Sequence, residues 1–459
     1  MAAPYPPGPR DWLGLKTARD FGHDTLSFTE WVHREFGDIV SFRMGPYRSY
    51  LFFHPDQIRD LLVTHWSSFR KMKHQVNVMK QWDGNGLVLS EGEFWQRQHR
   101  LVQPSFSSKR IRDYAQVMVT RTERRLNRWR KRPSFELDSE RNTLTMEIIT
   151  ECLFGSEVES RAKEIEAAVM HLSEIGVKEF QSPVSVPSWI PTSHNRCKAH
   201  AIRVLDGIIR GFIDERKRNP EMLKNRNDLL STLIAASDPQ LGRMTDTQAR
   251  DEAMVLFLAG HDTTATALIW IFYHLGLHPA WQEKIVSEIR AVAGERTPQF
   301  EDCEKLVLLR AFIQETIRLY PPAIGVFGRE NEREVSIGGY TIPKNSVVFT
   351  SSYTTHRDPR WFPDPLTFNP ERFLGARVKE IPHFAYFPFG GGPRICTGMQ
   401  FAMVEMALVV ATVLQRYQLE NEPNQVVEPK VMISLRPKNP IRVRVASRAS
   451  PIARSRGFF

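Results

Sequence analysis

One cysteine at the end of a glycine-rich turn constrains this chain more than any other feature. Residues 389–398 read FGGGPRICTG, and Cys396 stands two residues before a long apolar segment. Apolar side chains recur with helical spacing from Met399 to Leu414, so we expect a helix that begins just after Cys396. A thiolate at a helix start is stabilised by the helix dipole and by backbone N–H groups. The glycines allow the backbone to come close to the sulfur and to whatever the sulfur binds.

Two interpretations of Cys396 remain open at this point. It could be a small buried hydrophobic side chain, or it could be an axial thiolate ligand of haem iron, which favours cleavage of an O–O bond. In the second interpretation, Phe389 shields the sulfur from water and helps to set its redox potential. A nucleotide-binding turn at Gly390–Gly392 is disfavoured, because no apolar strand precedes it and no Lys-Ser/Thr pair follows it.

The number of cysteines and the hydropathy pattern predict an intracellular protein without a transmembrane segment. The chain has only four cysteines, and the other three, Cys152, Cys197 and Cys303, show no paired spacing. We therefore expect neither a disulfide framework nor a zinc site, which suits the reducing cytoplasm. The longest apolar stretch, Ala253–Leu277, is interrupted by polar residues and is interpreted as a buried helix.

The chain is basic, with a net charge of +10, and its basic residues are concentrated between positions 109 and 132. Arg121, Arg124, Arg125 and Arg128 belong to this segment. The segment could be an ordinary solvated helix face or a docking surface for an acidic redox protein. Nucleic acid is not an expected partner, because no recognised nucleic-acid module is present.

The pattern of elements predicts a mainly α protein with small β-sheets, an α+β fold. Length alone suggests two or three domains, but the motifs described below favour one domain over residues 1–459. A β-rich part is expected at about 36–55 together with 335–351, and a helical core at 90–330 and 385–415. Ile39–Met44 and Arg48–Phe53 flank Gly45-Pro46 and predict a hairpin. The stretch Val335–Ile342 is strand-like.

A long helix is expected to begin at the capping box formed by Thr245 and Gln248, and to end near Gly276. Its middle, residues 259–264, reads AGHDTT. Glycine and threonine are weak helix formers, and a threonine hydroxyl can bond back to the preceding turn. Alone, this motif would indicate only a tolerated kink. Val255, Ala259 and Thr263 recur every four residues and share one face.

Taken together, FGGGPRICTG and AGHDTT resemble the haem-binding loop and the distal-helix motif of cytochromes P450. The resemblance extends from Pro6 to Lys438 and includes Glu315-Thr316-Ile317-Arg318 and Pro370-Glu371-Arg372-Phe373. It implies the fold of a soluble, bacterial-type haem-thiolate monooxygenase, with a long central helix over a haem b.

By this resemblance, Cys396 ligates the iron, Thr263 hydrogen-bonds the dioxygen-derived group on the iron, and Asp262 relays protons from solvent. Glu315, Arg318 and Arg372 are implied to form a buried triad that supports the cysteine loop. His99 is followed by Arg100, so either of the two could reach a haem propionate. The other residues that the resemblance implies at the haem are Trp95, His99, Ala259, Gly260, Arg329, Phe389, Arg394 and Gly398.

The segments that line the substrate pocket in this family are apolar here. This content favours a hydrophobic ligand such as a fatty acid, terpenoid, alkane or steroid-like molecule. The expected lining residues are Val76, Val78, Val88, Val255, Ala259, Ile324, Val326, Phe327 and Met432.

The implied reaction inserts one atom of O2 into a C–H bond, with electrons from NAD(P)H passed through a separate ferredoxin- or flavodoxin-type protein. The chain is expected to be a monomer without a membrane span. Two alternatives stay open: a peroxide-driven haem oxygenase or isomerase, and a haem-binding sensor without catalysis. The pair Asp262-Thr263 argues against the first, because peroxide-driven reactions need no proton delivery. No regulatory or nucleic-acid motif supports the second.

Overall fold

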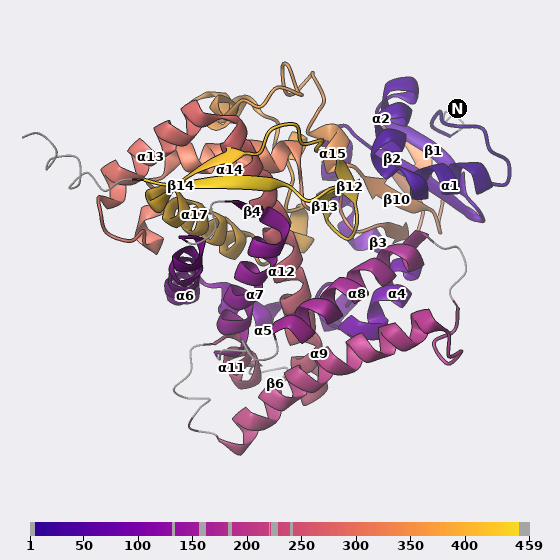
Figure 1. The fold of residues 1–459 in the computed structure, drawn as a ribbon. Helices are drawn as coiled ribbons and strands as arrows, with labels where there is room; N and C mark the ends of the chain where they lie inside the picture. The colour runs from indigo at the N-terminus through magenta and orange to yellow at the C-terminus, as the bar shows by residue number, and fades with distance from the viewer. Residues whose placement is uncertain are drawn as a thin grey trace, which may run out of the picture.

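A long central helix organises the computed structural model, which describes residues 5–130, 134–155, 162–181, 186–219, 221, 228–238 and 242–448. Figure 1 shows this helix, α12 (Asp246–Leu277), in the middle of the molecule, with α7 (Leu137–Phe154) packed along it. The predicted capping box is confirmed: the Thr245 hydroxyl accepts from the Gln248 N–H, and the Gln248 side chain accepts from the Thr245 N–H.

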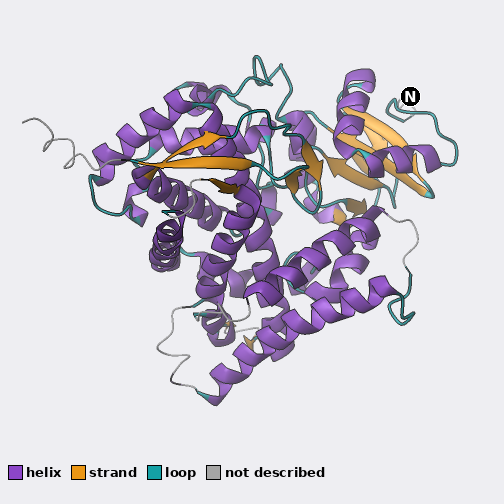
Figure 2. Ribbon diagram, in the orientation of Figure 1, coloured by secondary structure: helices purple, strands orange, loops and turns teal. Residues whose placement is uncertain are grey.

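Besides α12 and α7, the described residues form helices that lie both around α12 and beside the strands (Figure 2). They are α1 (Leu15–His23), α2 (Thr25–Phe36), α3 (Pro55–Arg59), α4 (Lys73–Asp83), α5 (Gly92–Val102), α6 (Ser108–Trp129), α8 (Ala162–Gln181), α9 (Ser193–Arg218), α11 (Leu229–Ala235), α13 (Pro279–Ala293), α14 (Val307–Leu319), α15 (Ser352–Thr355), α16 (Arg377–Glu380) and α17 (Met399–Arg416).

The strands form small sheets, so the predicted fold class is confirmed. The five-stranded sheet has the order β1-β2-β10-β7-β3, with β10 parallel to β2 and the other pairs antiparallel. A three-stranded sheet has the order β11-β14-β4, and the pairs β5-β6, β8-β9 and β12-β13 stand alone. The strands are β1 (Ile39–Met44), β2 (Tyr47–Phe52), β3 (Phe69–Lys71), β4 (Ser134–Glu136), β5 (Ser237–Asp238), β6 (Gly242–Arg243), β7 (Arg329–Asn331), β8 (Val335–Ile337), β9 (Tyr340–Ile342), β10 (Val347–Thr350), β11 (Tyr417–Asn421), β12 (Pro429–Val431), β13 (Leu435–Pro437) and β14 (Arg442–Ser447).

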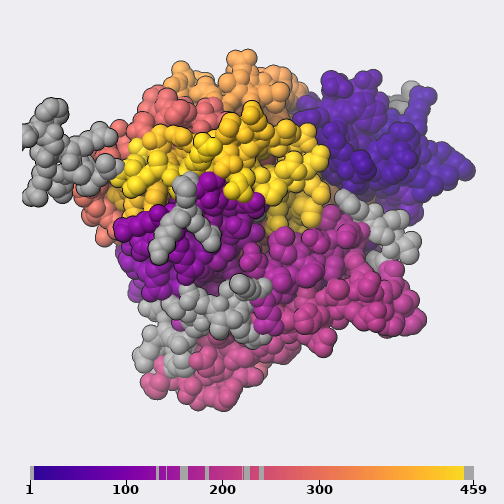
Figure 3. All heavy atoms as spheres, in the orientation of Figure 1, coloured from indigo at the N-terminus to yellow at the C-terminus, as the bar shows by residue number. Residues whose placement is uncertain are grey.

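The sheet joins segments that are far apart in the chain. Strand β2 lies between β1 and β10, so residues near position 50 pair with residues near position 350. In Figure 3 the N-terminal residues form a lobe at one side of the molecule, beside the body built by the helices.

The apolar core lies around α12 and α17. Trp270 of α12 is fully buried, stacks on Tyr320 at a centroid distance of 3.9 Å, and donates from Nε1 to the Leu435 carbonyl oxygen at 2.7 Å. Helices α12 and α17 are long and apolar enough to span a membrane, but most of each is buried inside the protein. Burial on all sides explains their apolar composition, as the sequence predicted for α12.

Candidate active site

A cavity of about 410 Å³ lies between the middle of α12 and the loop that precedes α17. The loop contributes residues 387–391 and 394–398 to its lining. Helix α12 contributes Val255, Leu256, Ala259, Gly260, Thr263, Thr264 and Ala267. The two sequence motifs therefore face each other across one cavity.

The turn before α17 holds Cys396 at the edge of this cavity. The Cys396 N–H donates to the Phe389 carbonyl oxygen at 3.0 Å, which closes the turn. Gly390 and Gly392 have φ angles of +73° and +66°, and a Cβ at Gly392 would lie 2.1 Å from the Leu62 carbonyl oxygen. Only glycine fits there, because a side chain would be strained and would also clash. Cys396 is accessible from the cavity.

The surroundings of the Cys396 sulfur favour the protonated thiol until a metal cation binds. Burial raises the pKa of the Cys396 thiol, while a hydrogen bond from the Gly398 N–H lowers it. The raised pKa means that the helix start alone does not produce a thiolate, contrary to the simplest expectation from the sequence. A metal ion at the sulfur would replace the proton and stabilise the anion.

Basic side chains gather at one edge of the cavity. Arg394 forms an ion pair with Glu91, donates to the Ser90 carbonyl oxygen at 3.0 Å, and lies 3.8 Å over the Trp95 ring. Arg329 is 7% exposed, and its Nε has no hydrogen-bond partner among the described residues. Buried cations need anionic partners, and among the described residues Glu91 is the one carboxylate that acts on all three cations of this group, Lys71, Arg329 and Arg394.

Lys71 belongs to the same group and was missed by the sequence interpretation. Its side chain lines the cavity, and burial together with the charge of Arg394 lowers its pKa to about 7. A lone lysine in the short segment FRK offers no sequence signal, since only the fold brings it to Arg329 and Arg394. Three basic side chains beside one carboxylate give this edge an excess of positive charge, which can bind further anions. The two propionates of a haem meet this need, so the residues present fit a haem.

His99 also lines the cavity, whereas Arg100 is exposed and does not. The His99 ring lies 5.2 Å from the Trp95 ring, one turn along α5. Of the two neighbours between which the sequence could not choose, His99 is the one beside the cavity.

The face of α12 formed by Ala259, Gly260 and Thr263, here called the groove of α12, lines the cavity. The Thr263 hydroxyl donates to the Ala259 carbonyl oxygen at 2.8 Å, the back-bond that the sequence predicted. Ala259 is exposed to the cavity, and Gly260 packs so tightly that a Cβ there would lie 2.9 Å from Ile149 Cδ1. This face of α12 therefore combines small side chains with one hydroxyl.

Asp262 lies away from the cavity, although the sequence predicted that it connects solvent to the catalytic centre. It is 4% exposed and forms a buried ion pair with Arg436 of β13. Burial raises the pKa of Asp262, but the charge of Arg436 and the Ser434 hydroxyl outweigh burial and lower it. The β12–β13 hairpin, 174 residues away in sequence, thus covers the carboxylate.

Replacing Arg436 with methionine is expected to lower the free energy of unfolding by about 3 kcal/mol, because Asp262 would be left as an unpaired buried charge. Urea denaturation measures the loss. Lys438→Met is the matched control two residues along, since Lys438 and Glu428 form an exposed pair with 58% and 54% of their side chains accessible. Equal, small losses in both variants would contradict the buried pair.

Glu315, Arg318 and Arg372 come together as the resemblance implied. Arg318 donates from Nε and Nη2 to the two Glu315 carboxylate oxygens at 2.7 and 2.8 Å, and both side chains are fully buried. Arg372 Nε lies 3.5 Å from Glu315 Oε1. The Asn369 N–H donates to the same oxygen at 2.8 Å, which ties the segment before Arg372 to α14.

His356 connects this triad to the cysteine loop. Arg318 Nη1 donates to the His356 carbonyl oxygen at 2.7 Å, and His356 Nε2 accepts from the Phe387 N–H at 2.9 Å. Burial and the charge of Arg318 lower the pKa of His356 well below its usual value, so the ring is neutral and can accept that bond. Phe387 lies two residues before Phe389, so the triad supports the loop through His356.

The expected substrate-lining residues divide into two groups. Val88, Val255, Ala259, Val326 and Phe327 line the cavity, but Val76, Val78, Ile324 and Met432 are not among the lining residues. Val78 is 1% exposed in the main core, and Ile324 packs on a cluster of Leu26, Tyr353 and Leu435. Packing against these neighbours turns Val78 and Ile324 away from the cavity.

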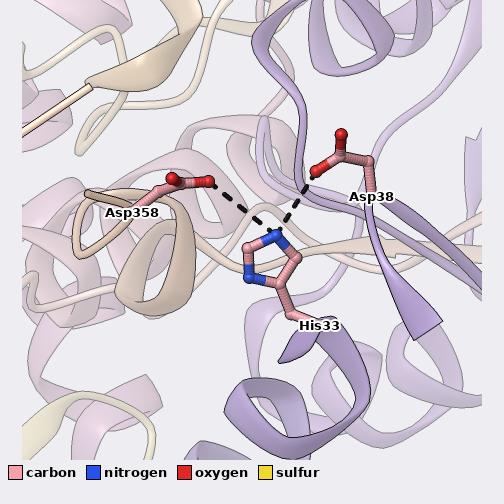
Figure 4. A group of neighbouring side chains, drawn as sticks. All are labelled: His33, Asp38 and Asp358. Carbon is pink, nitrogen blue, oxygen red and sulfur yellow. Dashed lines mark hydrogen bonds and ion pairs between the residues drawn. The ribbon is translucent and has the colours of Figure 1, made fainter. Parts of the chain in front are cut away.

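A second group of metal-ligating side chains lies at the N-terminal lobe, where His33, Asp38 and Asp358 converge (Figure 4). The Arg360 guanidinium already supplies a cation: Nη2 is 2.5 Å from Asp38 Oδ1 and 2.6 Å from Asp358 Oδ2. These bonds hold the pKa of Asp38 well below its usual range. The group is therefore an ion-pair network that ties α2 to the segment after α15.

Comparison with known proteins agrees with this geometry. The family model described as Cytochrome P450 matches residues 4–445. The chain is 34% identical to Cyclooctatin synthase of Streptomyces melanosporofaciens, over 87% of this chain and 86% of that protein. It is 32% identical to Cyclooctat-9-en-7-ol 5-monooxygenase of the same organism, over 84% of this chain and 83% of the relative. It is 29% identical to Pentalenene oxygenase of Streptomyces avermitilis, over 90% of this chain and 91% of that protein.

Proposed function

The chain belongs to the cytochrome P450 family, and on this premise we propose that it inserts one atom of O2 into a C–H bond of a terpenoid. The observation that carries the proposal is the cavity between Cys396 and the groove of α12. Apart from Thr263 and Thr264, the α12 side of that cavity is apolar. An apolar cavity with few polar groups favours a hydrophobic ligand.

Among hydrophobic ligands, the relatives favour the terpenoid class. Two of them are named for the oxidation of cyclooctat-9-en-7-ol and of pentalenene. The lining residues Val255, Ala259, Val326 and Phe327 offer no charged partner for a carboxylate. Lys71 does line the cavity, but it belongs to the basic group that we assign to the haem propionates.

A bound haem supplies the activation of dioxygen by two electrons, with one oxygen atom going to substrate and the other to water. In this chain, Cys396 would hold the iron, and Lys71, His99, Arg329 and Arg394 would hold the propionates. Trp95 packs beneath the Arg394 guanidinium and keeps it in place. Phe389 lines the cavity beside Cys396 and excludes water from the sulfur.

Thr263 is the hydroxyl best placed to hold a proton at the reacting centre, since it lines the cavity on the exposed face of the groove. Asp262 would deliver protons to Thr263 only if its carboxylate left the ion pair with Arg436 and bonded to another partner. Its lowered pKa keeps the carboxylate ionised at neutral pH, so it would accept a proton before passing it on.

The electron donor would be a separate ferredoxin- or flavodoxin-type protein that is reduced by NAD(P)H, in the cytoplasm. Helix α6 offers only part of the basic surface that its sequence suggested. Arg121 and Arg125 are buried in ion pairs with Glu151 and Glu140. Arg124 and Arg128 are exposed on the same helix and would face an acidic partner.

Replacing Thr263 with alanine is expected to leave NADPH consumption within about twofold and to lower the fraction of electrons that reach product by about tenfold. The lost electrons should appear as hydrogen peroxide, because protons are no longer delivered in the correct order. Peroxide and product are measured in the same reaction. Thr264→Ala, one residue along, is the comparison variant, and unchanged coupling in Thr263→Ala would contradict the assigned role.

The function is tested with purified protein, a ferredoxin, its reductase and NADPH under ¹⁸O2. A panel of terpenoid hydrocarbons and alcohols is compared with linear fatty acids. The proposal expects one ¹⁸O atom in a terpenoid product and a spin-state change when that terpenoid binds. A higher kcat/KM for fatty acids would overturn the terpenoid class. Faster turnover with hydrogen peroxide than with NADPH would overturn the monooxygenase reaction.

A further inference from the structure

A buried glutamate in the first turns of α12 has no role in the function proposed above. Glu252 is fully buried, and it precedes Ala259 by seven positions and Thr263 by eleven. At 3.6 residues per turn, these offsets place the three side chains within about 20° of one stripe along the helix. Glu252 thus continues the cavity-facing stripe of α12 beyond the cavity itself.

Glu252 connects α12 to two other walls of the cavity. Its Oε2 accepts from the Leu87 N–H at 2.9 Å, and its Oε1 accepts from the Gln98 side-chain amide at 3.0 Å. Leu87 and Val88 line the cavity directly. Gln98 stands on α5 next to His99, which lines the cavity at its basic edge.

The segment that carries Leu87 lies unusually close to α12. A Cβ at Gly86 would lie 2.6 Å from Val255 Cγ2 and 2.8 Å from the Asp251 carbonyl oxygen. The neighbouring Asp251 accepts from the Asn85 N–H at 2.8 Å. Two consecutive carboxylates of α12 therefore hold two backbone amides of the segment 84–88.

The two hydrogen bonds of Glu252 are what stabilise its buried carboxylate. No ion pair to Glu252 is found in the part of the chain that the structure describes, and burial raises its pKa to about 7. A buried carboxylate without a cation is stable only when its hydrogen bonds are complete. The bonds to Leu87 and Gln98 are therefore the ones that keep it in place.

We propose that Glu252 is a positioning residue, which fixes Leu87 and Val88 as a wall of the substrate cavity and sets their distance from helix α5. It touches neither substrate nor haem, and it acts through the Leu87 amide and Gln98. The size of ligand that the cavity admits would then depend on this bond. The inference rests on the proposed function for the cavity, but the anchor itself can be tested independently.

The test uses the holoprotein at pH 8, where the carboxylate is ionised, and two probes, imidazole and the bulkier 4-phenylimidazole. Glu252→Met removes both acceptor oxygens at nearly the same size, so amide hydrogen exchange of the segment 84–90 should become about tenfold faster. The Kd for 4-phenylimidazole should rise about tenfold, while that for imidazole changes by less than about twofold. Glu252→Gln keeps one oxygen for the Leu87 N–H and should restore slow exchange.

Glu288→Met is the matched control, because Glu288 also accepts from two backbone amides, Leu308 and Leu309 at 2.7 and 3.0 Å, but neither of these residues lines the cavity. It should alter neither Kd nor exchange at 84–90. Unchanged exchange at 84–90 in Glu252→Met would overturn the anchor. An equal rise in the Kd of both probes would overturn the role of Glu252 in shaping the cavity. The same rise in the Kd for 4-phenylimidazole in Glu288→Met would overturn it too. If neither probe binds the wild type, the proposed function fails, and the exchange result still decides the anchor.

Discussion

Cys396→Ala protein is expected to lose completely the red-shifted Soret band of the reduced carbonyl complex. That band reports a thiolate opposite the carbonyl, and Cys396 is the one cysteine among the described residues that line the cavity. Any haem that remains would be held only by the basic edge of the cavity, at Lys71, His99, Arg329 and Arg394. Product formation with NADPH should fall below detection, because the electron density that favours O–O cleavage comes from the sulfur.

Cys197→Ala is the control for this variant. Cys197 is exposed on α9, outside the cavity lining, so the band and the haem content should match those of the wild type. A red-shifted band that persists in Cys396→Ala would contradict the ligand assignment.

The second large effect is expected at the buried triad. Arg318→Ala removes two bonds to Glu315 and leaves that carboxylate fully buried without its main cation. The free energy of unfolding should fall by about 3–5 kcal/mol. Haem content should fall as well, since Arg318 also fixes the His356 carbonyl and, through His356, the Phe387 N–H of the cysteine loop.

Denaturation and the haem-to-protein ratio measure the two effects. Arg377→Ala provides the control, because Arg377 and Glu371 form a surface pair with 62% and 50% of their side chains exposed, and its loss should cost less than about 1 kcal/mol. A double variant, Glu315→Leu with Arg318→Met, should be more stable than Arg318→Ala, since it removes the fully buried carboxylate together with its fully buried cation and leaves only the partly exposed Arg372 without its partner. Normal stability and haem content in Arg318→Ala would contradict a supporting triad.

Much of the secondary structure could be predicted because its signals are local. The hairpin expected around Gly45-Pro46 is β1–β2, and the capping box at Thr245 begins α12. The stretch Val335–Ile342 is different: it forms a hairpin, β8–β9, because Gly338 and Gly339 take φ angles of +58° and +81° and reverse the chain. A strand-like composition does not reveal where a glycine pair turns.

The parts of the site that escaped prediction depend on long-range packing. The pairing of Asp262 with Arg436 joins a helix to a hairpin 174 residues later, and nothing local to either residue indicates it. Lys71 joins Arg329 and Arg394 only because β3 and β7 pair in the sheet. Val78 and Ile324 are apolar residues in the expected segments, but the direction of an apolar side chain is set by the neighbours that cover it.

The proposed function requires that the Cys396 sulfur binds the iron of a haem in the cavity beneath α12. The absorption spectrum of the purified wild-type protein, reduced and exposed to carbon monoxide, tests this bond. A strongly red-shifted Soret band is expected in stoichiometric yield. A spectrum of nitrogen- or oxygen-ligated haem, or of protein that takes up no porphyrin, would contradict it.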